Sequence, residues 1–188
     1  MKLNLGCGYK KLDGFVNVDN DIGCNPDLVV DLEKRLPWDD NSIDEIVMTH
    51  VLEHLGHDPK TYLSIWKELY RVSKDKGTIE IIVPYHDHQY FHDDPTHCRK
   101  VTPNGINLFN QKTNVESIEE GFSQSSLGLQ NLIDVEVTSH SYHFTDNFLK
   151  SFPNLNNDEK YLTASRFNNT ISEVMIQAIF HKPARYKN

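Results

Sequence analysis

Short apolar runs separated by polar turns recur along the first part of the chain and predict the strands of a buried sheet. The runs occupy residues 3–5, 15–18, 28–30, 43–49 and 78–83. Runs of this length between turn residues are typical of strands that are covered on both faces. One amphipathic helix is expected between the last two runs, because apolar residues recur there at helical spacing: Tyr62, Leu63, Trp66, Leu69 and Tyr70.

The ends of that helix also have sequence signals. Asp58 is a suitable N-cap, and Pro59 favours the first helical position. Gly77 marks its expected end. Segment 85–130 is irregular and rich in His, Asp and Asn, with one or two helices expected after Pro103, and two further strands are expected at 132–141 and 173–181. This alternation predicts the α/β class, in which ligands bind beyond the carboxyl ends of parallel strands.

Length and charge narrow the picture. A chain of 188 residues fits a single domain, residues 1–188, with 85–130 as a substrate-binding or lid insertion. The net charge of −8 disfavours nucleic-acid binding, which needs clustered basic residues. Three scattered cysteines indicate a reducing compartment, and we expect neither a signal peptide nor a membrane span, so the expected location is the cytoplasm.

The first turn predicts a nucleotide-type binding site. Gly6 and Gly8 allow a sharp turn and a close approach of the backbone to a ligand, and Asp19 ends the next apolar run, where a carboxylate can bind ribose hydroxyls. A dinucleotide fingerprint would have Gly or Ala where Lys11 stands, and its acidic residue would come later. An adenosine ligand without a pyrophosphate therefore fits better than NAD.

The ordered set of motifs resembles the class I S-adenosylmethionine-dependent methyltransferases, in particular a type 11-like bacterial and phage subset. The resemblance spans nearly the whole chain and rests on Leu3–Gly8, Gly14–Asp19, Val30–Leu32, Leu36–Pro37, Asp44–Val47 and His50–Leu55. It implies a Rossmann-like sheet of seven strands in the order 3-2-1-4-5-7-6, with strand 7 antiparallel. The cofactor it implies is S-adenosylmethionine.

The resemblance also implies roles for individual residues. Gly6, Cys7 and Gly8 would approach the methionine part of the cofactor, although Cys7 is as well explained as a small packing residue. Asp19 and Asn20 would hold the ribose. Asp31 and Leu32 would flank the adenine, with N-capping as the alternative role of Asp31. His50 would lie near the transferable methyl group.

Two features depart from the family pattern. Asn4 stands where an acidic residue is common. Only residues 9–14 separate Gly8 from the second strand, whereas parallel strands are normally joined by a dozen residues or more, so the first helix should be absent or reduced to about one turn. The cover over the site would then come from 85–130 or from another subunit, which would make the protein a homo-oligomer.

A second constellation suggests a metal. His50, Glu53 and His54 match the H-x-x-E-H pattern of some zinc proteases, but the methyltransferase-like order argues against a protease. The motif is similar to E-x-x-E-H in ubiquinone-biosynthesis and small-RNA O-methyltransferases, where it binds a divalent metal. A fourth ligand would come from the His-rich loop, which includes His97. The alternative is that Glu53 and His54 only fix the start of a helix.

The segment from Asp94 to Arg99 supplies the remaining catalytic candidates. His97 is the expected general base, because imidazole titrates near neutral pH, and Arg99 would bind an anionic part of the substrate or pair with a neighbouring aspartate. The sequence thus predicts O-methylation of a small-molecule or sugar-like acceptor. A non-catalytic S-adenosylmethionine-binding module and a metal-dependent hydrolase that uses the histidines remain as alternatives.

Overall fold

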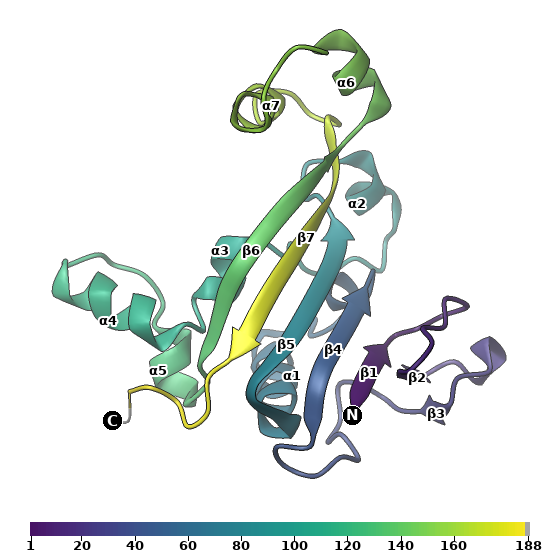
Figure 1. Ribbon diagram of the computed structural model, residues 1–188, viewed down its shortest axis with the longest axis vertical. Helices are drawn as coiled ribbons and strands as arrows, with labels where there is room; N and C mark the ends of the chain where they lie inside the picture. Colours follow the sequence, from purple (N-terminus) through teal and green to yellow (C-terminus); the bar gives the residue numbers. More distant parts are fainter. Residues whose placement is uncertain (187–188) are drawn as a thin grey trace.

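The computed structural model describes residues 1–186 as one twisted sheet with helices mainly on one face (Figure 1). The strands are β1 (Lys2–Leu5), β2 (Val16–Asp19), β3 (Leu28–Val29), β4 (Ile43–Thr49), β5 (Ser73–Pro84), β6 (Val135–Phe144) and β7 (Ile171–Phe180). Their order is β3-β2-β1-β4-β5-β7-β6. The first five strands pair in parallel, and β7 runs antiparallel to both β5 and β6. The predicted fold and strand order are confirmed.

Helix α1 (Pro59–Val72) begins where the sequence predicts but ends earlier. The side chain of Asp58 accepts hydrogen bonds from the backbone N–H groups of Lys60 and Thr61. The helix ends at Val72 because Ser73 is already extended, and Gly77 lies inside β5. Strand β5 pairs with β4 from Ser73, bulges, and resumes pairing at Thr78. The prediction that Gly77 ends the helix was therefore wrong.

Segment 85–130 divides into two parts. After β5, the chain forms α2 (Gln89–Asp93) and α3 (Pro103–Asn107), and then α4 (Gln111–Glu119) and α5 (Leu127–Asn131). Figure 1 places α2 near the carboxyl end of β5 and α4 and α5 toward the opposite end of the sheet. Only the first part of the segment thus lies where a cover is needed. Between β6 and β7, α6 (Asp146–Ser151) and α7 (Asn157–Ala164) extend beyond that carboxyl edge.

The first crossover is as short as the sequence predicts. Residues 6–15 join β1 to β2, and no helix forms in this part of the described chain. Asn4 holds the loop in place, because its amide donates to the carbonyl of Lys10 and to Oδ1 of Asn17, both at 2.9 Å. Oδ1 of Asn17 also accepts from the N–H of Leu12 at 2.8 Å. Asn4 therefore carries out a structural task that needs an amide donor.

The missing first helix leaves one face of the sheet without helices. In Figure 1, α1 and α3 lie behind the sheet, and the face toward the viewer carries no helix within residues 1–186. That face is largely polar along its centre, where Gln177 donates to Glu80 and Lys2 pairs with Glu45. The main hydrophobic core lies on the helix-covered face, where the fully buried Trp66 packs against Phe109 with ring centroids 4.9 Å apart.

Candidate active site

A cavity of about 680 Å³ opens at the carboxyl ends of β1, β2 and β4. Its volume lies within the usual range for small-molecule sites. The structure brings into this one cavity most of the residues that the sequence predicts for cofactor binding. The lining residues are Gly6, Gly8, Asp19, Asn20, Val30, Asp31, Leu32, Glu33, His50, Val51, His54 and Leu55.

The two glycines of the first turn are needed for different reasons. Both adopt left-handed conformations, with φ of +67° at Gly6 and +48° at Gly8, which are costly for other residues. A Cβ added to Gly6 would lie 2.3 Å from Cγ2 of Val51, whereas one added to Gly8 would meet nothing within 4 Å. Gly6 thus permits close packing, and Gly8 keeps the ligand side of the turn open.

Three carboxylates line the cavity, those of Asp19, Asp31 and Glu33. Asp19 fixes the glycine turn, since Oδ2 accepts from the N–H of Gly8 at 2.7 Å and Oδ1 from the N–H of Asp21 at 3.0 Å. Each of these oxygens keeps a second lone pair for a ligand hydroxyl. Asp31 accepts from the N–H of Glu33 through Oδ1 at 2.9 Å, so it caps a turn and lines the cavity at once. An acidic lining suits a cationic ligand.

Cys7 lies apart from the cavity that its neighbours line. Its side chain is 4% exposed, and its backbone N–H donates to the carbonyl of Val18. Burial raises the pKa of its thiol, with the nearby Asp19 adding to the effect, so the thiol stays protonated at neutral pH. The structure therefore places Cys7 as a packing residue of the turn, which was the alternative considered for it.

His50 lies between two carboxylates at the end of β4. Its Nε2 is 2.9 Å from Oε1 of Glu173 on β7, and its Nδ1 is 3.5 Å from Oε1 of Glu53. Glu173 also contacts Nδ1 of His143 at 3.0 Å. The pKa of His50 is raised, chiefly by hydrogen bonding to Glu53. Because both ring nitrogens face carboxylates, His50 is better suited to carry positive charge than to accept a proton from a substrate.

Glu53, His54 and His97 form a compact cluster beside the cavity. One ligand atom from each lies within 4.8 Å of the others. Glu53 is 1% exposed, and within the described residues its carboxylate has only a long contact with Nδ1 of His50, 3.5 Å from Oε1. A buried carboxylate with so weak a pairing is costly, so a cation held at this position would stabilise it. His54 also lines the cofactor cavity, which places the cluster at its edge.

The hydrogen bonds around the cluster fix the protonation of both imidazoles. Nδ1 of His97 is 2.8 Å from the carbonyl of Phe91, which can only accept. Thr96 donates its hydroxyl proton to Asp94 at 2.6 Å, so its Oγ1 accepts from Nδ1 of His54 at 2.9 Å. Each ring is therefore protonated at Nδ1, and each Nε2 keeps a free lone pair in the neutral form.

Arg99 does not reach the cavity. Its guanidinium carbon lies 3.9 Å from the centre of the Tyr62 ring, and the group donates to the carbonyl of Gly56. Among residues 1–186, Arg99 forms no ion pair with an aspartate. The expected pairing with Asp93 or Asp94 is therefore absent, because stacking on Tyr62 directs the charge of Arg99 toward α1. Binding of a substrate by Arg99 stays a prediction.

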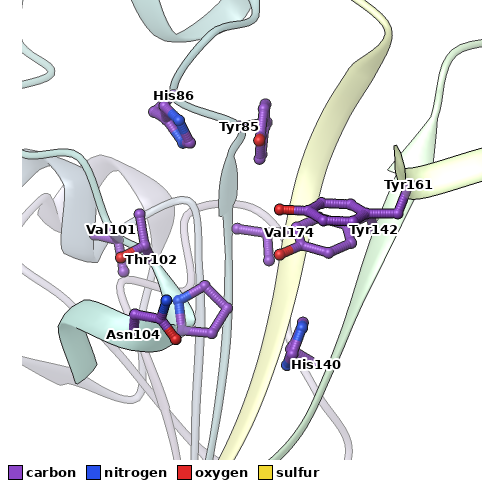
Figure 2. Close-up of a pocket in the computed structure, with 10 residues that line it drawn as sticks. Tyr85, His86, Val101, Thr102, Asn104, His140, Tyr142, Tyr161 and Val174 are labelled. Atoms are coloured by element: carbon purple, nitrogen blue, oxygen red, sulfur yellow. The ribbon is translucent and has the colours of Figure 1, made fainter. Parts of the chain in front are cut away.

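The structure adds residues that the sequence did not single out. A second cavity of about 310 Å³ opens beside the end of β5, and three of its lining residues are Tyr85, Tyr142 and Tyr161 (Figure 2). Glu173, the partner of His50, comes from β7. No sequence spacing marks the three tyrosines or the pair of His50 and Glu173. Their members lie far apart along the chain, and only the tertiary fold brings them together.

Comparison with known proteins agrees with the site. Residues 15–81 match a family model described as a methyltransferase domain. They cover the strand that carries Asp19 and the motif that carries His50, Glu53 and His54. The matched segment is similar to a methyltransferase domain, and the whole chain has the Rossmann-like fold of the S-adenosylmethionine-dependent methyltransferases. No curated protein matches the chain.

Solved structures share the fold of this chain at low sequence identity. A SAM-dependent methyltransferase from Archaeoglobus fulgidus is 18% identical with a TM-score of 0.58, and the match covers 95% of this chain and 85% of that one. A SAM-dependent methyltransferase from Methanosarcina mazei is 17% identical with a TM-score of 0.51, and the match covers 96% of this chain and 92% of that one. A complex of the Haloferax volcanii Trm112 activator with a putative methyltransferase is 13% identical with a TM-score of 0.52, and the match covers 95% of this chain and 81% of that one. Within residues 1–186, no helix is both long and apolar enough to cross a membrane.

Proposed function

We propose that this protein transfers the methyl group of S-adenosylmethionine to a hydroxyl oxygen of a small-molecule or sugar-like acceptor. The observation that carries the proposal is the cluster of Glu53, His54 and His97, which has two free imidazole Nε2 atoms at the edge of the cofactor cavity. A neutral amine can attack the methyl group through its free lone pair, whereas a hydroxyl is a weak nucleophile until a base takes its proton, which is the task that a free imidazole nitrogen can perform. The net charge of −8 favours a small acceptor over a nucleic acid.

The cofactor residues act by position and charge. The backbone at Gly8 lies against the methionine part, Asp19 and Asn20 hold the ribose hydroxyls, and Asp31 and Leu32 flank the adenine. The charge on the imidazolium of His50 offsets Glu53 and Glu173 close to the transferable methyl group.

The transfer is a single displacement. A lone pair of the acceptor oxygen forms a bond to the methyl carbon, the carbon–sulfur bond breaks, and its electron pair returns to sulfur to give S-adenosylhomocysteine. The hydroxyl proton passes to Nε2 of His97 or His54. In-line positioning supplies most of the acceleration, because the sulfonium is already a strong electrophile.

The cofactor assignment is tested by calorimetry with S-adenosylhomocysteine. Wild-type protein should bind it, and Asp19→Ala should weaken binding by about 100-fold, the effect of losing charge-assisted hydrogen bonds worth roughly 1.5–3 kcal/mol. Asp13→Ala, on the same connection and outside the cavity lining, is the matched control. Unchanged affinity in Asp19→Ala, or no binding by the wild type, would refute the assignment.

A divalent metal is a second proposal for the same cluster, and the weakly paired carboxylate of Glu53 favours it. Glu53, His54 and His97 would hold the ion, so His97 would replace His50, the third ligand predicted from the sequence. Phe91 and Thr96 already orient both imidazoles from behind, as metal-ligating histidines require. Such a mixed donor set suits Mn²⁺, Fe²⁺ or Zn²⁺. A bound ion would act as a Lewis acid on the acceptor hydroxyl.

The metal is tested without reference to turnover. Titration of the apo protein with Zn²⁺ or Mn²⁺ should show one site and raise the melting temperature. Glu53→Gln should abolish both effects, whereas His92→Ala, in the same His-rich loop but outside the cluster, should retain them. Equal metal affinity in Glu53→Gln and the wild type would contradict the metal proposal. The imidazole of His97 or His54 would then be the proton acceptor without a metal.

A further inference from the structure

The tyrosine-lined cavity, defined as the space bordered by Tyr85, Tyr142, Tyr161 and their neighbours, lies on the same edge of the sheet as the cofactor cavity (Figure 2). Tyr85 and His86 line the tyrosine-lined cavity directly after β5, and His50 directly follows β4, which pairs with β5. The two regions therefore lie at the ends of neighbouring strands, which are about 4.8 Å apart. Along β7 they lie on opposite faces of the sheet, since Glu173 contacts His50 and its neighbour Val174 lines the cavity, so an acceptor bound to both would pass over the ends of the strands.

The cavity lining has no permanently charged side chain. Ten of the described residues line it, and none is Asp, Glu, Lys or Arg. A phosphate or carboxylate would therefore find no Lys or Arg among the lining residues, and an ammonium group would find no Asp or Glu. Burial raises the pKa of Tyr85 to about 12 and also raises that of Tyr142, so both phenols stay protonated and act as hydrogen-bond donors and acceptors.

Seven of the ten lining side chains carry a hydroxyl, amide or imidazole: Tyr85, His86, Thr102, Asn104, His140, Tyr142 and Tyr161. Figure 2 shows the hydroxyls of Tyr142 and Tyr161 directed toward the opposite wall, where Thr102 and Asn104 lie. An apolar ring bound here would separate those of these groups that it covers from water, at about 1–3 kcal/mol for each group left without a partner. A ligand with several hydroxyls would satisfy them.

Aromatic surfaces complete the lining. Tyr142 from β6 and Tyr161 from α7 stack with ring centroids 4.6 Å apart, and Tyr85 meets Tyr142 edge-on at 5.8 Å. Together with Pro103 and Val174 they offer apolar surface to the C–H groups of a saturated ring. A volume of about 310 Å³ is at the low end for small-molecule sites, which suits a single ring better than an extended ligand.

We propose that the tyrosine-lined cavity binds an uncharged, polyhydroxylated ring of the methyl acceptor, the chemistry of a neutral sugar. The inference rests on the proposed function and specifies its substrate class. The part of the acceptor held here is remote from the reacting oxygen, so its binding energy serves to position that oxygen near the methyl group.

The test is saturation-transfer NMR on the full chain with S-adenosylhomocysteine bound. The probes are neutral methyl glycosides (gluco, galacto and manno), glucose 6-phosphate, glucuronate and phenol. We expect signal transfer to at least one neutral glycoside and weaker transfer to the charged sugars and phenol. Tyr142→Phe and Tyr85→Phe keep the rings and remove one hydroxyl each, and each should weaken glycoside binding about fivefold, the loss expected for one hydrogen bond of about 1 kcal/mol.

Tyr90→Phe is the matched control, because Tyr90 is 58% exposed and does not line the cavity. The inference is overturned if no neutral glycoside binds, if the charged sugars or phenol bind more tightly, or if Tyr90→Phe weakens binding as much as Tyr142→Phe. Calorimetry with S-adenosylhomocysteine distinguishes failure of this inference from failure of the proposed function. Normal cofactor binding with no glycoside binding refutes only this inference. Absence of cofactor binding in the wild type refutes the proposed function.

Discussion

The proposed cofactor region and the proposed acceptor region are built in different ways. The cofactor region uses strand ends and backbone groups within residues 6–55, and short loops join its strands. The acceptor region draws Tyr85, Tyr142 and Tyr161 from three separate elements and adds α6 and α7 above the edge of the sheet. A ligand held by local backbone geometry leaves a sequence pattern, whereas one held by side chains from distant elements does not.

The two regions also differ in the structure that supports them. The cofactor region has lost the helix of its first crossover, yet Asn4 and Asn17 hold the shortened loop by hydrogen bonds. The proposed acceptor region instead has a second small core, formed by Phe148, Ala164 and Ile171 under the β6–β7 connection. We expect cofactor binding to need the turn and the strand ends but not a helix in the first crossover, because hydrogen bonds already hold the loop.

The largest expected effect tests the glycine turn. Gly6→Ala combines a left-handed backbone with a Cβ placed 2.3 Å from Val51, so we expect a loss of about 2–5 kcal/mol in the free energy of unfolding. Gly8→Ala meets only the backbone strain and should cost about 1–2 kcal/mol. Urea denaturation of both variants measures the difference. Equal losses would mean that the contact with Val51 does not limit this position.

An intermediate effect on stability is expected from a change in the loop between β1 and β2, which Asn4 holds in place. Asn4 is 4% exposed and donates to two acceptors, so Asn4→Asp would place a buried carboxylate against two oxygens. We expect a loss of about 3 kcal/mol in the free energy of unfolding, because an unpaired buried charge costs more than a neutral group. Asn20→Asp, at an exposed position, is the control. If Asn4→Asp is as stable as the control, the amide is not what holds the crossover.

The smallest expected effect concerns His50, whose two ring nitrogens face the carboxylates of Glu53 and Glu173. Its pKa in the folded state is raised above the unfolded value, so its contribution to stability is fully present below the unfolded pKa and is lost as pH rises through the folded pKa. The wild type should therefore lose more stability than His50→Gln as pH increases from about 6. Chemical denaturation across this pH range measures it, and parallel curves would contradict the assignment.

Some of the site could be predicted from the sequence. Asp19 and Asp31 each follow an apolar strand, and parallel strands end at one edge, so their joint presence in the cavity follows from the pattern. His97 was identified as chemically important, but its pairing with Glu53 and His54 depends on how the loop after β5 folds back over η2 (Leu52–His54). The stacking of Arg99 on Tyr62 could not be predicted for the same reason, since only the fold brings the two side chains together.

The sequence by itself determined the positions of most strands, the glycine turn and the carboxylates at the strand ends, because these depend on residues that are close along the chain or follow a regular period. The strand order was implied by the family resemblance and not by the periodicity. The tertiary structure alone decided that Asn4 holds the first crossover, that His50 pairs with Glu173, and that tyrosines from β6 and α7 meet Tyr85. Side-chain contacts between distant elements depend on the packing of the whole chain, and hydrophobic periodicity records only which face of each element is buried.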